Sequence, residues 1–283
     1  MSGPAVAPQV PAAARPVTPT TILAAELDAV CDELDGVAGV PAPVTARLRR
    51  IRDLAVGLDS YVGECTTPES ADLARLARRT AATDWAHRDA PPQSVFLEQE
   101  MLSGHVEGQA LKFLVRLSGA TRVLEIGMFT GYSALAMAEA LPAGGSVLAC
   151  EVDAEVARFA RECFDESPVG DRISIAVGPA MDTLRAQAES FDGVPFDFVF
   201  IDADKAGYRG YLDFLLDSPL LGPDAVIAVD NTLMQGQPYT GGERSPNGEA
   251  IADFNRAVAD DPRVEQVLIP LRDGVTLIRR VSG

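Results

Sequence analysis

The chain has 283 residues, of which 47% are hydrophobic, and this is enough for one large α/β domain with an appendage. A formal net charge of -17 would repel both a nucleic-acid backbone and an anionic membrane, so we expect neither as a partner. There is no apolar run near the roughly 20 residues of a membrane span, no signal-peptide pattern and no paired cysteine spacing. We therefore expect a cytoplasmic protein that acts on a small molecule.

The first third of the chain divides by composition. Its beginning is rich in Ala, Pro and Val and has no periodicity, whereas apolar residues then recur at helical spacing in three successive runs. Pro91 and Pro92 mark the end of these runs. We predict a flexible tail, a helical extension and a main domain, at residues 1–19, 20–92 and 93–283.

In the main domain, short apolar runs alternate with helical patterns, which is typical of a doubly wound parallel sheet. The last two runs are instead joined by Arg272-Asp273-Gly274, a hairpin signal with no helix between them. The prediction is an α/β fold with a mostly parallel seven-stranded sheet and an antiparallel C-terminal hairpin. The expected strands are residues 122–127, 147–151, 173–177, 196–201, 225–229, 264–269 and 275–278.

The strand at residues 196–201 ends in Asp202, Asp204 and Lys205, and the next strand ends in Asp230-Asn231. Open α/β sheets bind their ligands outside the carboxyl ends of the strands, so the two strand ends can direct oxygen ligands to one point. Such a set suits Mg²⁺. The alternative is that these acids only cap helices, but a pair of strand ends with a lysine beside one of them favours a metal site.

A glycine-containing turn from Glu125 to Ser133 joins the first strand to the first helix of the sheet, and Glu151 ends the second strand. Glu151 is placed to accept hydrogen bonds from ribose hydroxyls. The turn lacks the G-x-G-x-x-G pattern and begins with a glutamate, which would face a pyrophosphate badly. S-adenosylmethionine, which has an ammonium group and no phosphate, fits better. A purely structural turn and a nicotinamide-dependent dehydrogenase are the alternatives.

The motifs LEIGMFTGYSALAMAEALP, ACEVD, FDFVFIDADKAGY and VDNTLMQGQ resemble the cation-dependent O-methyltransferases of the caffeoyl-CoA and catechol type. The resemblance runs from about Met101 to the C-terminus and implies a Rossmann-like methyltransferase fold. It implies that a divalent ion, Mg²⁺ or else Mn²⁺ or Ca²⁺, is held by Asp202, Asp230 and Asn231. It implies a catalytic base, Lys205. The implied S-adenosylmethionine pocket contains Ser103, Glu125, Gly127, Met128, Ser133, Glu151, Ala180 and Asp204. The implied substrate contacts are Met101, Tyr208, Gln235 and Tyr239.

One departure from the family pattern is Ala206-Gly207, which replaces the usual acidic pair after the lysine and puts the substrate contacts in doubt. Longer segments, such as GLDSYVGECTTPES, resemble a narrower branch, the O-methyltransferases of mycosporine biosynthesis. This likeness implies methylation of demethyl-4-deoxygadusol, a cyclohexenone with adjacent oxygens. A catechol or caffeoyl-type phenol is the alternative substrate, because it offers the same chelating pair.

Three further expectations concern mechanism and assembly. Nearby cations and burial should lower the pKa of Lys205, so that its neutral amine can take a hydroxyl proton. The irregular segment at residues 235–248 is expected to be a lid or substrate loop, with a plain surface connection as the alternative. The N-terminal helices should cover the active-site mouth or contact a second copy in a homodimer. An interaction protein that uses these helices is the non-enzymatic alternative.

Overall fold

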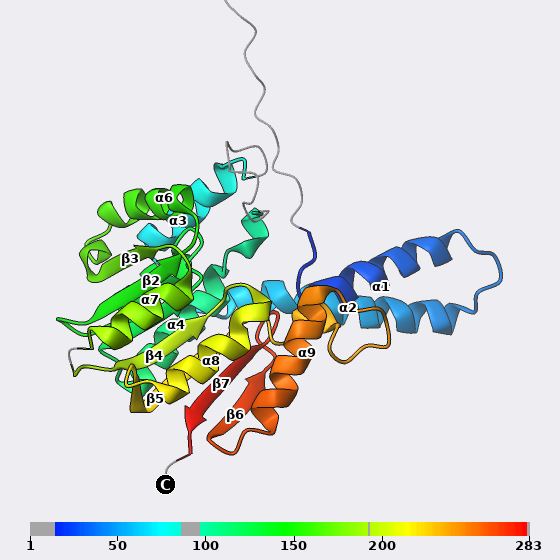
Figure 1. The fold of residues 1–283 in the computed structure, drawn as a ribbon. Coiled ribbons are helices and arrows are strands. Elements are labelled where there is room, and N and C mark those ends of the chain that lie inside the picture. The colour runs from blue at the N-terminus through cyan, green and yellow to red at the C-terminus, as the bar shows by residue number, and fades with distance from the viewer. Residues whose placement is uncertain (1–14, 86–96, 192, 282–283) are drawn as a thin grey trace, which may run out of the picture.

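The computed structural model describes residues 15–85, 97–191 and 193–281. Its centre is a seven-stranded sheet (Figure 1). The strand order is β3-β2-β1-β4-β5-β7-β6, and β7 runs antiparallel to both of its neighbours while the first five strands are parallel. The predicted fold class is confirmed, including the C-terminal hairpin. The strands are β1 Arg122–Ile126, β2 Ser146–Glu151, β3 Ile173–Val177, β4 Phe196–Ile201, β5 Leu221–Val229, β6 Val264–Ile269 and β7 Val275–Arg280.

Helices occupy the connections between the strands and the N-terminal third. The α-helices are α1 Pro19–Asp35, α2 Ala42–Glu64, α3 Ala71–Ala82, α4 Gly104–Ser118, α5 Tyr132–Ala140, α6 Ala154–Asp165, α7 Ala180–Glu189, α8 Tyr208–Asp217 and α9 Pro246–Ala259. Four short 3₁₀ turns are η1 Gln99–Met101, η2 Gly170–Arg172, η3 Lys205–Gly207 and η4 Met234–Gly236.

Two hydrophobic clusters cover the two faces of the sheet. One contains buried residues of α3, α4, α5 and α6, and the other contains buried residues of α8 and α9 with Leu184 of α7. β4 lies between them, and Phe198, Val199, Phe200 and Ile201 are all fully buried. Each such side chain contributes roughly 1.5–3 kcal/mol on burial, which is why this strand reads as a continuous apolar run.

The helix α3 belongs to this core, although it lies within the predicted extension. Leu73 and Leu76 are almost fully buried in the first cluster, and α3 contacts α5. The helices α1 and α2 differ, because they pack mainly on each other and form a helical hairpin that projects from the rest of the chain (Figure 1). We call this hairpin, residues 19–64, the arm.

The arm has a well-defined beginning and segregated charge. Thr18 and Thr21 form a capping box around Pro19 at the first turn of α1. α1 carries five acids and no base, whereas four arginines lie in the first half of α2. Arg49 pairs with Asp35 at 2.6 Å, which joins the two helices near the tip of the arm.

Two predictions fall on residues outside the described part of the chain. They are most of the predicted tail and the boundary at Pro91-Pro92. Within residues 15–85, 97–191 and 193–281, no helix combines the length and the apolar character needed to cross a membrane.

Candidate active site

The carboxyl ends of β1, β4 and β5 lie side by side at one edge of the sheet. Backbone pairing continues past the strands, because the amide of Asp202 donates to the carbonyl of Ile126 and the amide of Asp230 donates to that of Ile201, both at 2.9 Å. These bonds fix Asp202 between β1 and β5 and bring Asp230 beside it. The structure therefore brings together the two strand ends that were predicted to converge.

Gly127 makes this close approach possible. Its φ is 90°, and a Cβ at this position would lie 2.1 Å from the carbonyl oxygen of Asp202. No other residue fits there without displacing the end of β4. The amides of Gly127 and Met128 both donate to the carbonyl of Cys150, which closes the turn after β1 over the end of β2.

Backbone strain is concentrated at the same edge. In the described part of the chain the non-glycine residues with positive φ are Phe129, Asn231, Met234, Gln235 and Arg272. Phe129 lies in the loop after β1, the next three follow β5, and Arg272 lies in the turn before β7. Such conformations persist where the surrounding structure fixes them, and they are common at active sites.

The ammonium group of Lys205 lies among the oxygens of this edge. Its Nζ donates to Asp202 Oδ1 at 2.9 Å, to Asn231 Oδ1 at 2.5 Å and to the hydroxyl of Tyr208 at 2.7 Å. The Lys205 side chain is only 12% exposed. Two of the three residues that were expected to hold a metal therefore share one cationic partner.

The pKa of Lys205 was expected to be lowered by burial and a nearby cation, whereas the acids of the chain act in the opposite direction. Burial acts to lower the pKa, but the charge of Asp202 and the contact with Tyr208 outweigh it, so that the pKa of Lys205 is raised. The expectation counted burial and a nearby cation and left out the acids that surround the amine.

The oxygens at this edge fit a divalent cation as well as an ammonium group. Asp230 is buried, and its Oδ1 has no hydrogen-bond partner among the described residues. Burial and the neighbouring charge of Asp202 raise the pKa of Asp230, although Lys205 offsets part of this. Two carboxylates and an amide oxygen are ligands that Mg²⁺ accepts, with its other positions left to water or substrate.

This donor set is not a cluster of classical metal ligands. Within the described residues, no group of three or more His, Cys, Asp and Glu side chains is arranged to hold a metal ion. The expected third ligand, Asn231, is an amide, so the set depends on only two carboxylates. Its positive φ of 59° directs the side chain of Asn231 away from the course of β5 and towards Lys205.

A second set of acids lies at the ends of β1 and β2. Glu125 is fully buried, and neither of its carboxylate oxygens has a hydrogen-bond partner in the described chain. Burial raises the pKa of Glu125 well above its usual value, and Ser133 beside it offsets only part of the shift. A buried acid left without a donor fits a ligand that brings one, such as an ammonium group.

Glu151 is held differently, by the backbone. Its two oxygens accept hydrogen bonds from the amides of Phe129 at 2.8 Å and Asp153 at 2.9 Å. Burial raises the pKa of Glu151, and these two donors act in the opposite direction. Because each oxygen can accept a further bond, the fixed carboxylate remains able to bind hydroxyl groups.

The other residues of the expected cofactor pocket lie around the same edge. Ser103 is a buried residue immediately before α4, and Ala180 begins α7. Met128 is buried in the loop between β1 and α5, and Ser133 is buried in the first turn of α5. Asp204 is exposed, and its carboxylate accepts a hydrogen bond from Tyr211 at 2.7 Å.

The expected substrate residues differ in exposure, and one of them is buried in the core. Met101 and Tyr239 are exposed, at 43% and 61%. The backbone amide of Gln235 donates a hydrogen bond to Asp273 Oδ1 at 2.6 Å. Tyr208 is fully buried, stacks edge-on against Phe254 and donates its hydroxyl to the carbonyl of Asp230. In this position Tyr208 has no surface for a substrate, and it holds Lys205 instead.

Glu107, Arg272 and Asp273 also lie at this edge, although they were not among the predicted site residues. Glu107 and Asp273 are 1% and 5% exposed, and Arg272 Nη1 donates to Glu107 Oε2 at 3.1 Å. Glu107 could have been found from the sequence, because it precedes the buried Leu111 and Val115 at a spacing of four residues. A carboxylate within the apolar stripe of a helix is a signal of a polar site.

A doubly wound sheet with strained loops and unpaired buried acids at the ends of its strands defines an enzyme of the Rossmann-like methyltransferase class. The model of the O-methyltransferase family matches residues 88–281. The chain therefore belongs to the O-methyltransferase family, and the prediction of an O-methyltransferase is confirmed.

Similar proteins agree with this assignment. The chain is 39% identical to caffeoyl-CoA O-methyltransferase of Petroselinum crispum over 62% of its own length and 75% of that protein. It is 41% identical to caffeoyl-CoA O-methyltransferase 2 of Zea mays, over 62% of this chain and 69% of that one.

Two solved structures are similar over most of the chain. One is the Podospora anserina methyltransferase PaMTH1 bound to SAH, with a TM-score of 0.69 and 28% identity over 81% of this chain and 96% of that one. The other is the O-methyltransferase from Bacillus cereus in complex with SAH, with a TM-score of 0.66 and 29% identity over 80% and 97%.

Proposed function

We propose that the chain transfers a methyl group from S-adenosylmethionine to one of two adjacent oxygens of a small molecule, with the help of a divalent cation. The observation that carries the proposal is the arrangement of Asp202, Asp230 and Asn231 around a buried ammonium group, with Asp230 Oδ1 still unpartnered. Oxygens that attract the ammonium group of Lys205 also suit a divalent ion, which is smaller and more highly charged.

The cofactor proposal is supported by the two buried glutamates and by the relatives. Glu125 offers unpaired acceptors for the ammonium group of the methionine moiety, and Glu151 is fixed to receive the ribose hydroxyls. PaMTH1 and the Bacillus cereus enzyme bind SAH, the demethylated product of this cofactor. We carry this binding over to the present chain.

Asp202, Asp230 and Asn231 would hold the cation. When bound, a divalent ion supplies positive charge that orients adjacent oxygens and makes their protons more acidic. The chain itself supplies the alignment, because β4 and β5 fix the ligands through backbone hydrogen bonds next to the loop that ends β1. Alignment of an attacking oxygen with a methyl group accounts for much of the rate in such a transfer.

Lys205 is the proposed base. Its Nζ lies at the centre of the site, where a substrate hydroxyl bound beside Asp202 would be within its reach. Because Asp202 raises the pKa of Lys205, the amine can lose its proton only after its contacts with Asp202 and Asn231 have been replaced. The neutral amine takes the hydroxyl proton while the oxygen forms a bond to the methyl carbon, and the bond between that carbon and sulfur breaks to release S-adenosylhomocysteine.

For the substrate we propose demethyl-4-deoxygadusol, which would become 4-deoxygadusol in mycosporine biosynthesis. The support is the likeness of longer segments, such as GLDSYVGECTTPES, to that branch. The alternative is a catechol or caffeoyl-type phenol, which is favoured by the caffeoyl-CoA relatives. Both candidates present adjacent oxygens.

A substrate panel tests this proposal. The purified chain is incubated with S-adenosylmethionine, Mg²⁺ and demethyl-4-deoxygadusol, catechol or caffeoyl-CoA, and the gain of one methyl group is measured by mass spectrometry. We expect methylation that stops in excess chelator and returns with Mg²⁺. Full activity in chelator would exclude the cation, and methylation of phenols alone would select the alternative substrate.

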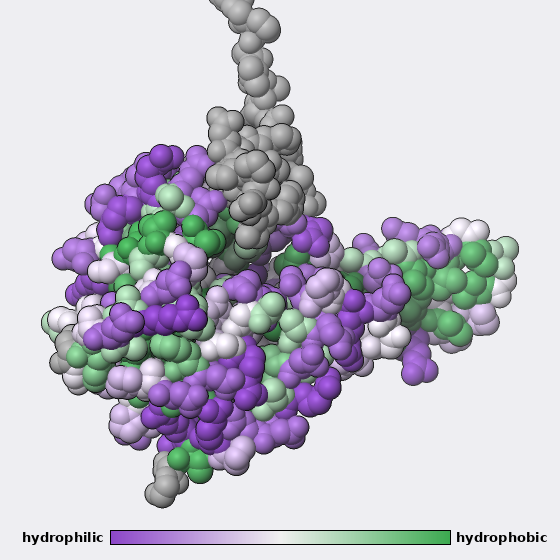
Figure 2. Space-filling model, in the orientation of Figure 1, coloured by the Kyte–Doolittle hydropathy of each residue, from purple (hydrophilic) through white to green (hydrophobic). Residues whose placement is uncertain are grey.

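We also propose that the chain is a cytoplasmic homodimer in which the arms of two copies pack together. Figure 2 shows apolar residues on the arm, where Leu54 and Tyr61 are 76% and 66% exposed. The described cysteines are all unpaired, which suits a reducing compartment.

Light scattering after size exclusion tests the dimer. The chain should have the mass of two copies, and replacing Leu54 and Tyr61 by glutamate should reduce it to the mass of one. A single-copy mass for the unaltered chain, or an unchanged mass after the replacements, would contradict the proposal.

A further inference from the structure

Trp85 lies outside the region that matches the O-methyltransferase family, yet it packs beside the expected cofactor pocket. The family model begins at residue 88, and Trp85 follows the end of α3. It is the only tryptophan of the chain and is 7% exposed. Its indole nitrogen donates to the carbonyl of Thr80 at 2.8 Å, which fixes the ring against the last turn of α3.

The indole ring of Trp85 packs against two phenylalanines that belong to different elements. Its centroid lies 5.2 Å from that of Phe129, in the loop after β1, and 5.2 Å from that of Phe159, in α6. The rings are inclined at 58° and 74°, which is a favourable geometry for aromatic pairs. Leu97 and Val156 belong to the same buried cluster. Trp85 therefore joins the loop after β1 to the helix after β2.

These two elements carry the two backbone donors that hold Glu151. The amide of Phe129 donates to Oε2 of Glu151, and the amide of Asp153, the N-cap residue of α6, donates to Oε1. Phe129 has a φ of 49°, a conformation that costs free energy in a non-glycine residue and persists only where the surroundings impose it. The contact with Trp85 supplies such a constraint, because it restrains the ring of the strained residue.

The end of α3 restrains the same elements in two further ways. The hydroxyl of Thr80 donates to that of Thr130 at 3.0 Å, and both residues are fully buried. Arg79 lies over the ring of Phe159, with its guanidinium carbon 5.1 Å from the ring centroid. The segment from Arg79 to Trp85 thus holds two consecutive residues of the loop after β1 and one residue of α6.

A tryptophan that only fills the core would stabilise the fold without favouring any one ligand contact. That role predicts no relation between the ring partners of Trp85 and a ligand-binding side chain. The partners observed are instead Phe129, which itself donates to Glu151, and a residue of the helix whose N-cap amide is the second donor.

We propose that Trp85 is a positioning residue for the cofactor, which holds the loop after β1 and α6 together so that the carboxylate of Glu151 is aimed at the ribose hydroxyls. The end of α3 then belongs to the cofactor site, although it precedes the region that matches the family. The inference rests on the proposed function, because it requires that Glu151 receive the ribose of S-adenosylmethionine.

The test measures the binding of S-adenosylhomocysteine by calorimetry, in the unaltered chain and in Trp85→Leu. We expect the variant to bind about 3- to 10-fold more weakly, which is the equivalent of one lost aromatic pair. Trp85→Phe keeps a ring against Phe129 and should recover most of the affinity. An unchanged affinity in Trp85→Leu, or an equal loss in Trp85→Phe, would overturn the inference.

A double-mutant cycle with Glu151→Ala supplies a readout that a purely structural role would not move. If Trp85 acts through Glu151, Trp85→Leu should not weaken binding further once the carboxylate is absent, so the two losses should not add. Additive losses would overturn the inference, because Trp85 would then support binding by another route.

The same cycle separates this inference from the proposed function. If Glu151→Ala weakens binding and Trp85→Leu does not, the cofactor role of Glu151 stands and the role of Trp85 is overturned. If Glu151→Ala binds S-adenosylhomocysteine as tightly as the unaltered chain, or the unaltered chain does not bind it, both are overturned.

Ser70→Ala is the matched control, because Ser70 holds the other end of α3. Its hydroxyl accepts from the amide of Leu73 at 3.1 Å and donates to Glu139 at 2.5 Å, so the replacement loosens α3 without touching the ring contacts of Trp85. This variant should bind S-adenosylhomocysteine as tightly as the unaltered chain. An equal loss in Ser70→Ala and Trp85→Leu would overturn the inference, since it would be a general effect of loosening α3.

Phe159→Leu takes the place of Trp85→Leu if that variant does not fold. It removes the ring on the α6 side of the contact and leaves Trp85 itself in place. We expect the same loss of affinity, and no further loss when it is combined with Glu151→Ala. An unchanged affinity would again contradict the role of Trp85.

Discussion

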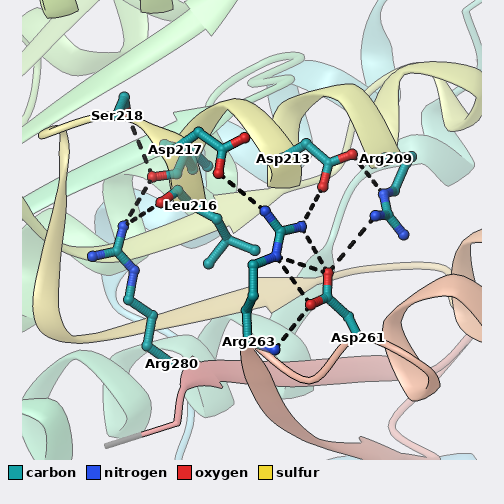
Figure 3. A network of polar contacts seen from close by, with 9 residues as sticks. Arg209, Asp213, Leu216, Asp217, Ser218, Asp261, Arg263 and Arg280 are labelled. Atoms are coloured by element: carbon teal, nitrogen blue, oxygen red, sulfur yellow. Dashed lines mark hydrogen bonds and ion pairs between the residues drawn. The ribbon is translucent and has the colours of Figure 1, made fainter. Parts of the chain in front are cut away.

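Two acidic clusters in this chain have opposite degrees of pairing. In the cluster of Figure 3, Arg263 donates to Asp213, Asp217 and Asp261 at 2.6, 3.0 and 2.7 Å, and Arg209 binds Asp213 from the other side. At the carboxyl ends of the strands, Glu125, Glu107 and Asp230 keep buried oxygens without a partner.

The difference shows which acids stabilise the fold and which remain available to a ligand. The paired cluster joins α8 to the segment between α9 and β6, and its hydrogen bonds lower the pKa of Asp261 to about 2. At the strand ends, burial raises the pKa of Glu125, Glu151 and Asp230. A fold keeps such costly groups where function requires them.

Asp202→Ala should have the largest effect on turnover of the variants considered. It removes an expected cation ligand and the main charge that faces Lys205, so we expect turnover to fall by on the order of 10³-fold, the equivalent of several kcal/mol. Binding of S-adenosylhomocysteine should remain measurable by calorimetry. Turnover that survives at the normal rate, with or without chelator, would contradict the metal role.

Lys205→Met should lower the rate of methyl transfer by about 10²- to 10⁴-fold, as is typical for the loss of a general base. The apparent KM should change little, because the methionine fills the same volume without donating to Asn231 or Tyr208. Steady-state kinetics with S-adenosylmethionine would show a lowered kcat with a nearly unchanged KM. An unaltered kcat at neutral pH would remove Lys205 as the base.

Glu125→Gln should weaken S-adenosylhomocysteine binding about 10- to 100-fold, which corresponds to the loss of a hydrogen bond to a charged group of about 1.5–3 kcal/mol. The binding partner lost is the ammonium group of the ligand. Because the carboxylate is buried and unpaired, its neutral replacement should not lower the thermal unfolding midpoint measured without ligand. Unchanged affinity in calorimetry would show that the turn after β1 does not face the cofactor.

Arg263→Gln should have the smallest effect, and only on stability. The cluster is partly exposed, so we expect the free energy of unfolding to fall by about 1 kcal/mol at pH 7, with normal methyl transfer. Asp261 has a lowered pKa in the folded chain, so its contribution is present above pH 4 and is lost as the pH falls through about 2.

Urea unfolding at several pH values checks this prediction. The difference between the variant and the unaltered chain should be constant near neutrality and should shrink between pH 4 and pH 2. A difference that grows on acidification would have the wrong sign for a salt-bridged aspartate.

The pattern of the sequence was sufficient for the sheet. Periodicity located every strand of the main domain to within a few residues, and the Arg272-Asp273-Gly274 signal correctly turned β7 antiparallel. The sequence pattern also predicted that Asp202 and Asp230 lie side by side, because neighbouring parallel strands end at the same edge of the sheet. Such features depend on local spacing and on the handedness of the crossovers, which the chain carries in its own order.

Tertiary structure alone decided which side chains share that edge. Glu107 and Arg272 are separated by 165 residues, so no local spacing could pair them, and Tyr208 was assigned to the substrate although its ring belongs to the core. The effect of Asp202 on the pKa of Lys205 belongs to the same class, since it depends on the acids that folding gathers around the amine. Electrostatic environment is a property of distances in space, and a sequence fixes those distances only after every element has packed.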